Sequence, residues 1–587
     1  MPIVALSSTL GSNDGRGTLW RGLEASEVDG SITRLAHGGF GASSNLGSSD
    51  IVVVSESATG LQPASIAEAY RREGFGCLRQ LQGSFAFALY DRERALLFAA
   101  SDLTSRCPLA YWSNGRTAIV SSSVLRILEH PDVGRALDEP YLAHLIAGLW
   151  GAPAGTTALK DVRRIPAGQG LIARKGIVEL VQVDRLARRT RANGTRQAWA
   201  DAFWDELDDA VERAVSAAPS CLALSGGLDS AALASVIGRR APGSSSMAAF
   251  SIVAPASGED ESAAIGALER AYVGGIANQR IDCSEAVELS GADRFDLHDD
   301  PLMIPLSFVP ARMRMWEVAR AAGYRAMIDG EGGDELFSLL IGPRDALVRG
   351  RLLHAWRHLR ASRARRSTFL WAFALPILPA MAQQAWAWRR ARSGDRFPSY
   401  LTERARSHPA IREAARRFFE RHIEEDFVHE VEHWLSNPVT IGVRSTHRHL
   451  ASAHGMTLIS PFLDRRVVEL VLGIPAQWIL SDRYKGFLAD AEVGRVPEDV
   501  RTRAKDDRLA TLFQRKVLTS RSVRKALDDP RVRDRLGDWV RFDRVHGLLD
   551  AIGSGYDPSD VTFWIQIQGV IGFAYWYARA SREYGIT

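Results

Sequence analysis

Two short segments in the middle of the chain combine glycines with hydroxyls and carboxylates in a pattern that suits phosphate and metal chemistry. The first, 225–230, reads Ser-Gly-Gly-Leu-Asp-Ser and follows the apolar run 221–224. The glycines allow a tight turn, and the helix expected next presents free N–H groups and a partial positive charge. The hydroxyls of Ser225 and Ser230 can donate to phosphate oxygens, whereas the carboxylate of Asp229 suits Mg²⁺. We interpret the segment as a pyrophosphate-binding loop, against the simpler alternative of an ordinary glycine turn.

The second segment, 330–337, reads Gly-Glu-Gly-Gly-Asp-Glu-Leu-Phe and follows the apolar residues 326–328. Three glycines and three carboxylates in eight residues are an unusual choice for a merely structural turn at the start of a helix. We predict that Asp334 shares a role at Mg²⁺ and pyrophosphate with Asp229, and that Glu331 acts as a general base.

The elements around these segments follow an α/β pattern. Apolar residues recur at helical spacing from 199 to 215, and the apolar runs 221–224 and 248–253 flank a helical pattern at 230–239. Strand, helix and strand in this order predict a parallel sheet. The rest of the chain to residue 587 is expected to be mostly helical.

The first 185 residues have a different character. Short apolar runs recur there between glycine and serine clusters, which predicts a β-rich sandwich. We expect three parts: a β-rich domain at 1–185, an arginine-rich linker at 186–195, and the α/β domain at 196–587. The clearest strand candidates are 51–54, 85–90, 95–98, 118–120 and 171–173.

Composition excludes several classes of protein. The chain has 587 residues, 46% hydrophobic and 24% charged, with four cysteines and a formal net charge of +4. This is ordinary globular composition without a disulfide framework, and the charge gives no reason to expect nucleic acid binding. The longest apolar run, 369–382, is short and contains Pro376 and Pro379, so neither a membrane span nor membrane association is expected. No signal peptide is recognisable, and we expect a cytoplasmic protein.

The 225–230 loop resembles the PP-loop of the N-type ATP pyrophosphatases. Together with 330–335 it is similar to the asparagine synthetase B superfamily. Further matching segments are 83–91, Asp102, 108–111, 298–302, 460–464, Lys485, 495–497 and 501–505. The resemblance implies an N-terminal, degenerate Ntn-type glutamine amidotransferase-like sandwich. It also implies a C-terminal PP-loop ATP pyrophosphatase domain, adenine nucleotide α-hydrolase-like, with helical additions.

The same resemblance implies ATP and Mg²⁺ as cofactors and assigns roles to individual residues. The carboxylates of Asp229 and Asp334 would hold the metal, Glu331 would be the base, and Lys505 would stabilise the oxyanion and the departing phosphates. The implied ATP and pyrophosphate site comprises Leu224, Ser225, Gly226, Gly227, Leu228, Asp229, Ser230, Ser251, Gly330 and Lys485.

The chain departs from the family pattern at its second residue. Glutamine-using members have a nucleophilic cysteine there, whereas this chain has Pro2, which has no nucleophilic side chain. The glutaminase reaction therefore cannot run in this way, and we expect the first domain to be a scaffold and the attacking amine to come from another source.

Two classes within the superfamily fit this expectation. β-Lactam synthetases typically have tyrosine where this chain has Glu331, whereas lasso-peptide macrolactam synthetases keep the glutamate. Glu331 favours the lasso class, with a precursor core peptide as substrate and a leader peptidase and a leader-binding protein as partners. A β-lactam synthetase, an ammonia-dependent asparagine synthetase and an inactive scaffold are the alternatives.

Residues 343–440 match the family weakly and are rich in arginine and tryptophan. Such a helical surface can hold a peptide, dock a partner, lie on a membrane, or be a solvated basic face that is packed on its apolar side. We assign no catalytic role to it.

Overall fold

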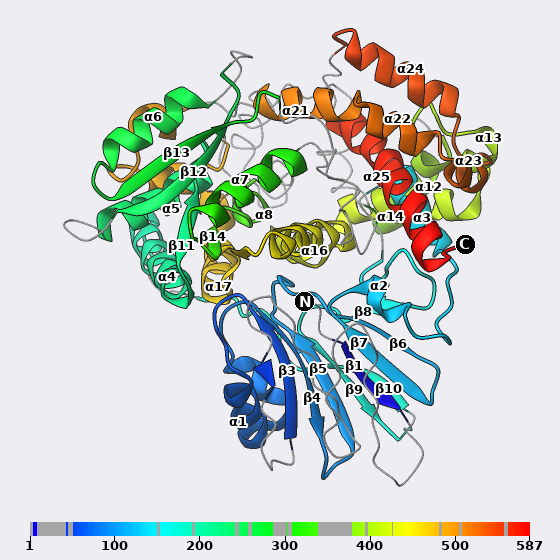
Figure 1. The fold of residues 1–587 in the computed structure, drawn as a ribbon, viewed down its shortest axis with the longest axis horizontal. Helices are drawn as coiled ribbons and strands as arrows, with labels where there is room; N and C mark the ends of the chain where they lie inside the picture. Colours follow the sequence, from blue (N-terminus) through cyan, green and yellow to red (C-terminus); the bar gives the residue numbers. More distant parts are fainter. Residues whose placement is uncertain are drawn as a thin grey trace.

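The computed structural model confirms an α/β protein with a β-rich N-terminal part and a C-terminal part built on a parallel sheet (Figure 1). The structure describes residues 4–8, 43–44, 51–149, 153–175, 177–190, 194–240, 246–255, 261–285, 301, 308–338, 379–393, 397–424, 427–479, 484–503, 508–556 and 561–587.

The N-terminal part is a sandwich of two antiparallel sheets. One has the order β1-β7-β6-β8 and the other β10-β9-β5-β4-β3-β2. Small and aliphatic residues from both sheets, including Ala88, Ala99 and Val120, form the core between them. The strands are β1 (Val4–Ser8), β2 (Ser43–Ser44), β3 (Ile51–Ser57), β4 (Phe85–Asp91), β5 (Leu96–Ser101), β6 (Ala110–Ser113), β7 (Thr117–Ser121), β8 (Arg163–Arg164), β9 (Gln169–Arg174) and β10 (Ile177–Gln182). The five predicted strand segments are thus confirmed.

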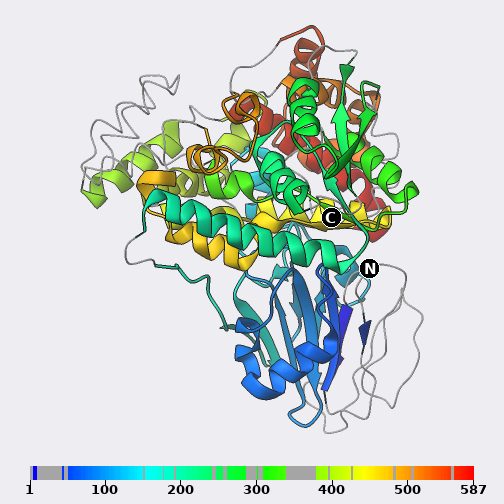
Figure 2. The ribbon, with the colours of Figure 1, turned by 90° about the vertical axis from the view of Figure 1, so that its left-hand side faces the viewer.

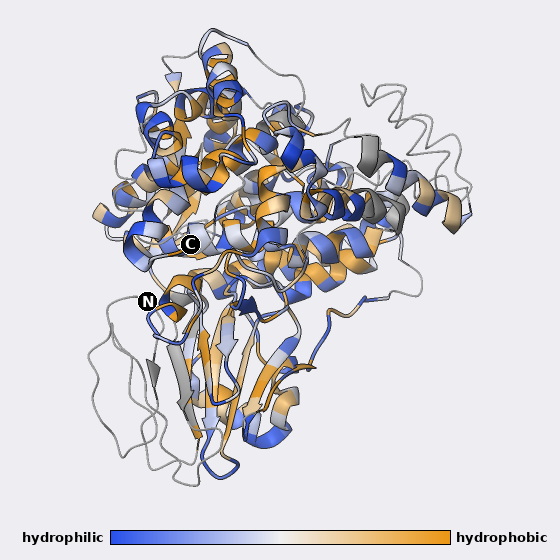
Figure 3. Ribbon diagram, turned by 90° about the vertical axis from the view of Figure 1, so that its right-hand side faces the viewer, coloured by the Kyte–Doolittle hydropathy of each residue, from blue (hydrophilic) through white to orange (hydrophobic). Residues whose placement is uncertain are grey.

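Helices that we did not predict complete this part. They are α1 (Pro63–Glu73), η1 (Gly74–Arg79), α2 (Val124–Ile127) and α3 (Glu139–Ile146). Helix α1 covers the outer face of the larger sheet, where Tyr70 and Ile66 pack with Phe87 and Phe98. Figure 3 shows that apolar residues are frequent along these strands.

The C-terminal part contains a five-stranded parallel sheet of order β13-β12-β11-β14-β15. Its elements are α4 (Arg196–Ala217), β11 (Ser220–Ala223), α5 (Leu228–Arg240), β12 (Met247–Val253), α6 (Ser262–Ala271), β13 (Ile276–Asp282), α7 (Val309–Ala321), β14 (Ala326–Ile328), α8 (Gly333–Phe337) and β15 (Thr457–Ile459). The predicted helix begins at Arg196, with Trp199, Phe203, Leu207 and Val211 buried; Val215, expected on the same face, is exposed.

The remaining described segments are mostly helical, as expected. They are α12 (Ala380–Ser393), α13 (Glu403–Ser407), α14 (Pro409–Glu424), α15 (Phe427–Ser436), α16 (Pro438–Ala453), η7 (Pro461–Leu463), α17 (Arg465–Gly473), α18 (Ala476–Ile479), α19 (Gly486–Ala491), α20 (Glu498–Arg501), α21 (Arg508–Leu518), α22 (Arg521–Leu527), α23 (Pro530–Leu536), α24 (Phe542–Gly553) and α25 (Val561–Tyr584). None of the helices that the structure describes combines the length and apolarity that a membrane crossing needs.

The two parts are joined along a broad interface, with the sandwich below the C-terminal part in Figures 1 and 2. Near the middle, Arg444 Nη1 of α16 donates to the Thr104 carbonyl at 3.0 Å. At the far edge, the Leu137 N–H donates to the Thr587 carbonyl at 3.2 Å, and the Thr587 N–H donates to the Arg135 carbonyl at 3.0 Å. Arg135 Nε also donates to the Tyr584 carbonyl at 2.7 Å.

Candidate active site

The strand order places the two glycine-rich segments side by side. Strands β11 and β14 are neighbours in the sheet, and each ends at one of the two glycine-rich segments. Strands β12 and β13 lie on one side of β11, whereas β14 and β15 lie on its other side. Ligands of open α/β sheets bind at the carboxyl ends of the strands at such a reversal point. The predicted pairing of 225–230 with 330–335 is therefore built into the topology.

The loop 225–230 is held by its own hydroxyls. Ser230 Oγ accepts a hydrogen bond from the Ser225 N–H at 3.1 Å and lies 2.8 Å from the Ser225 carbonyl oxygen. Ser225 Oγ accepts from the Gly227 N–H at 3.2 Å. The Leu224 N–H donates to the Phe250 carbonyl at 2.9 Å, which fixes the start of the loop to the sheet. The two serines thus shape the loop as well as offering hydroxyls.

One backbone N–H of this loop already donates a hydrogen bond to a carboxylate. The Gly226 N–H donates to Glu261 Oε2 at 3.0 Å, and Arg503 Nη1 lies 3.9 Å from Glu261 Oε1. An anionic oxygen on a loop N–H at a helix N-terminus is the contact that a phosphate oxygen would make. The loop geometry therefore fits an anion. Our sequence reasoning did not find Glu261; Arg503 lies in the segment 501–505 that resembles the family, but we assigned no role to it.

Glycines allow the second loop to close over Asp229. A Cβ on Gly330 would lie 2.8 Å from the Asp229 Cβ, and one on Gly333 would overlap Asp229 Oδ1. Gly332 has φ +99°, a left-handed conformation that favours glycine. The glycines of 330–333 are thus explained by close approach and backbone conformation.

Lys485 joins the two carboxylates that we assigned to Mg²⁺. Its buried Nζ contacts Asp229 Oδ2 and lies 2.9 Å from Asp334 Oδ1. The Tyr484 hydroxyl donates to Asp334 Oδ1 at 2.7 Å, and the Ser338 hydroxyl does so at 2.8 Å. Two carboxylates and one ammonium thus meet between the loops.

Burial and this lysine shift the acidities in opposite directions. Burial raises the pKa of Asp229 to about 6, although Lys485 opposes the rise. Burial would also raise the pKa of Asp334, but Lys485, Tyr484 and Ser338 hold it below its ordinary value. Burial lowers the pKa of Lys485, but the two aspartates outweigh this effect and keep the ammonium charged.

The site fits a magnesium ion. Asp229 Oδ1 is buried and has no hydrogen-bond partner among the described residues, which leaves it available to a cation. Within the described ranges, no group of three or more His, Cys, Asp or Glu residues could hold a metal ion. Two carboxylates suffice for Mg²⁺, which is commonly bound through one or two of them together with substrate phosphates.

Glu331 lies beside a second group of charges. Arg444 Nε is 3.5 Å from Glu331 Oε1, and Arg444 Nη2 is 2.7 Å from Glu335 Oε1. The Glu331 N–H donates to Asp329 Oδ1 at 3.2 Å. Burial, followed by the charge of Asp329, raises the pKa of Glu331 to about 7, against the pull of Arg444. A carboxyl with this acidity can exchange a proton near neutral pH.

Both loops border a cavity of about 740 Å³. Apolar and aromatic residues form its opposite wall, and Arg312 Nη1 there lies 3.0 Å from His447 Nδ1. The principal residues of this wall are Phe308, Met315, Trp316, Trp434, Val443 and Leu509. The cavity can take a substrate that has both an ionic end and an apolar body.

The structure brings most predicted site residues to this cavity. Those that line it are Leu224, Ser225, Asp229, Ser230, Gly330, Glu331 and Asp334. Gly226 and Gly227 belong to the same loop, Leu228 begins α5, and Lys485 reaches Asp229 from the residue before α19. Ser251 is fully buried on β12, where its hydroxyl donates to Asn278 Oδ1 at 3.0 Å, and it is not part of the lining. Lys505 lies outside the described residues.

The arginine- and tryptophan-rich region is described only in part, because residues 343–378 lie outside the described ranges. In the remainder, Glu413 on α14 forms ion pairs with Arg416 and Arg417. Helix α14 packs against α12 and against α3 of the N-terminal part (Figure 1). One side of this region is thus a packing surface, and a role in holding a peptide stays a prediction.

Comparison with known proteins gives a consistent assignment. The family described as "Asparagine synthase" matches residues 202–577, and the family described as "Glutamine amidotransferase domain" matches residues 58–182. The N-terminal part is thus an Ntn-type, glutamine amidotransferase-like domain.

Several curated proteins are similar over part of their length. The glutamine-hydrolyzing asparagine synthetase 3 of Bacillus subtilis is 32% identical over 168 residues, 27% of this chain and 26% of the relative. A putative glutamine-hydrolyzing asparagine synthetase of Mycobacterium bovis is 28% identical over 285 residues, 46% of this chain and 42% of the relative. The chain thus spans less than half the length of these relatives.

A solved chain described as "structure of the allosteric regulatory enzyme of purine biosynthesis" is 12% identical, with 54% of this chain and 60% of that chain covered. Its TM-score is 0.17, which carries no argument. Members of the asparagine synthase family are ATP-dependent ligases that form AMP and pyrophosphate. The asparagine synthase model matches more than half of the residues of this chain, so the chain belongs to the asparagine synthase family.

Proposed function

We propose that this chain closes a macrolactam ring in a ribosomal lasso peptide. It would adenylate an internal Asp or Glu side chain of the leaderless precursor, after which the peptide's N-terminal α-amine would attack the activated carbonyl. The observation that carries the proposal is the position of Glu331, a partly buried carboxyl with a pKa of about 7 at the edge of a cavity with an aromatic wall.

The residues divide the reaction between them. The substrate carboxylate attacks the α-phosphorus of ATP bound at 225–230. The bond between the α-phosphorus and the bridging oxygen breaks, and pyrophosphate leaves. Mg²⁺ held by Asp229 and Asp334 would neutralise phosphate charge, and Lys485 keeps those carboxylates in place. Lys505 is proposed to stabilise the oxyanion.

The second step requires a neutral amine. An α-amine has a pKa of about 7.7–8.0, compared with about 10.4 for a lysine side chain, so less free energy is needed to deprotonate it. Glu331 with its raised pKa is matched to accept this proton. The amine nitrogen then forms the amide bond, AMP leaves, and the peptide loses the elements of one water molecule.

Two features favour a peptide over a free amino acid. Pro2 replaces the nucleophile that would release ammonia from glutamine, so the amine must come from another source. The wall formed by Phe308, Trp316 and Trp434 suits apolar side chains rather than aspartate. Partnership with a leader peptidase and a leader-binding protein belongs to the same proposal.

The test measures AMP release and product mass with Mg²⁺–ATP and a leaderless candidate peptide. Matched controls are the same peptide with its acceptor Asp or Glu changed to Asn or Gln, and the peptide with an acetylated N-terminus. We expect AMP and a product lighter by one water only from the unmodified peptide. AMP formed with aspartate and ammonia, and asparagine as the sole product, would refute the proposal in favour of an asparagine synthetase.

A further inference from the structure

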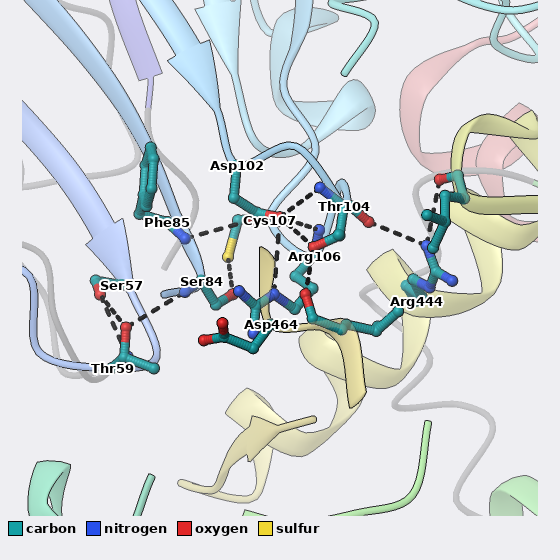
Figure 4. Close-up of polar contacts among 12 residues, drawn as sticks. Ser57, Thr59, Ser84, Phe85, Asp102, Thr104, Arg106, Cys107, Arg444 and Asp464 are labelled. Atoms are coloured by element: carbon teal, nitrogen blue, oxygen red, sulfur yellow. Dashed lines mark hydrogen bonds and ion pairs between the residues drawn. The ribbon is translucent and has the colours of Figure 1, made fainter. Parts of the chain in front are cut away.

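A second cavity, of about 300 Å³, lies between the N-terminal sandwich and the C-terminal part. Ser57, Ser84 and Arg106 line it from the sandwich, and Arg444 on α16 lines it from the C-terminal part; Figure 4 labels all four residues. Glu331 belongs to the lining of both cavities. The smaller cavity therefore adjoins the candidate active site but has its own walls.

The lining of this cavity is strongly cationic. Five arginines contribute to it, namely Arg106, Arg320, Arg325, Arg444 and Arg448, and the only carboxylate in the lining is Glu331. Arg444 is balanced by Glu335 and Glu331. No ion pair joins Arg320 or Arg325 to another described residue, so the cavity has an excess of positive charge.

Arg106 is ion-paired with Asp102 but keeps an unsatisfied hydrogen-bond donor beside the cavity. Its side chain is only 8% exposed, and its Nε has no hydrogen-bond partner among the described residues. Arg106 Nε lies 3.7 Å from Asp102 Oδ1, beyond hydrogen-bonding distance. That oxygen already accepts from the Thr104 N–H at 3.0 Å, and the Thr104 hydroxyl lies 2.7 Å from it (Figure 4).

Arg325 repeats this pattern from the opposite wall. Its Nη1 is buried and has no hydrogen-bond partner among the described residues. A buried polar group without a partner destabilises the fold, and it does so more strongly when it is charged. Two such guanidinium groups on one cavity are therefore best explained by a ligand that both can bind.

We propose that this interdomain cavity binds an organic carboxylate. The planar fork of arginine matches a carboxylate through two parallel hydrogen bonds. Ser57, Ser84 and Thr457 add hydroxyls, whereas Met456 and Leu463 provide an apolar wall that an inorganic phosphate would not use. The carboxylate comes from a free small acid or from the acidic end of a peptide, and the chemistry recognised is the same. This inference does not depend on macrolactam formation.

The test uses the full-length protein without ATP and measures glutarate binding by isothermal titration calorimetry. Glutaramide, its neutral analogue, is the control ligand. The variants are Arg106→Gln and Arg325→Gln, and the matched control is Arg314→Gln, an α7 arginine whose side chain is 59% exposed and pairs with Glu317. ATP binding and circular dichroism of each variant verify that the fold and the nucleotide site are intact.

We expect glutarate to bind the wild type and Arg314→Gln equally, and each cavity variant about tenfold more weakly. Arg325 is only partly buried, so its variant keeps the test valid if Arg106→Gln fails to fold. Competition by trialanine, but not by its C-terminal amide, would identify a peptide carboxylate as the source; glutarate binding without such competition would indicate a free acid. Any of four results would overturn the inference. Glutarate does not bind, glutarate binds the cavity variants as tightly as the wild type, glutaramide binds as tightly as glutarate, or inorganic phosphate binds more tightly than glutarate.

Discussion

The raised pKa of Glu331 predicts that its replacement makes the protein more stable while it abolishes amide formation. The folded-state pKa is about 7, against 4.5 for an ordinary glutamate. A carboxyl whose folded pKa is raised keeps its proton more tightly when folded, so it lowers stability as pH rises from the unfolded value through the folded one. Glu331→Gln removes this pH-dependent penalty because the amide does not ionise.

The difference of about 2.5 pKa units corresponds to about 3 kcal/mol, reached only above the folded pKa. The linkage relation gives a penalty of about 1 kcal/mol at pH 5 and about 3 kcal/mol at pH 8.5. The free energy of unfolding of Glu331→Gln, relative to that of the wild type, should therefore be about 2 kcal/mol higher at pH 8.5 than at pH 5. The attraction of Arg444 for Glu331 is already included in the raised pKa, so no separate correction applies.

The assay is urea unfolding at pH 5 and pH 8.5, followed by tryptophan fluorescence. The control is Glu317→Gln, whose side chain on α7 is 47% exposed and should change stability by less than about 0.5 kcal/mol at either pH. In parallel, amide formation by the wild type should fall about tenfold per pH unit below pH 7, since the base must be ionised. Equal stability of Glu331→Gln and wild type at both pH values would refute the assigned acidity.

Two further predictions concern the meeting point of the loops. Lys485→Met leaves Asp229 and Asp334 facing each other without a cation and should lower the free energy of unfolding by about 3 kcal/mol. In urea unfolding, added Mg²⁺ should restore part of this loss. An unchanged unfolding midpoint would contradict the structural role of Lys485. Gly333→Ala places a methyl group against Asp229 and should weaken Mg²⁺–ATP binding about tenfold, as measured by calorimetry. The control is Gly442→Ala on α16, where a Cβ meets open space, and this variant should bind Mg²⁺–ATP as the wild type does. Equal losses in both glycine variants would argue against the steric explanation.

Local patterns in the sequence predicted the elements that carry the two loops. The apolar runs before 225 and 330 are β11 and β14, and their pairing in one parallel sheet accounts for the meeting of Asp229 with Asp334. Strand β13 was missed because four of its seven residues are polar and the strand lies at the edge of the sheet. Strand β15 was missed because three residues give no recognisable period.

Other parts of the site had no local signal. Arg444 lies in the middle of α16, more than a hundred residues beyond Glu331 and Glu335, and only the tertiary fold brings it to them. Glu261 likewise reaches Gly226 by folding alone. Tyr484 did have a signal, because it stands next to the singled-out Lys485. The roles of Glu331 and Lys505 stay predictions.

The hydrogen bonds between residues 135–137 and residues 584–587 bear on how the protein is made. Arg135 and Tyr584 are 449 positions apart, so the ribosome adds the second long after the first. At about 5–20 residues per second, the interval is on the order of 20–90 seconds. During this time the strands of the sandwich can pair locally, but residues 135–137 lack the hydrogen bonds that residues 584–587 supply later. The N-terminal part must therefore persist without these hydrogen bonds during synthesis, which makes residues 135–137 a natural place for a chaperone to act.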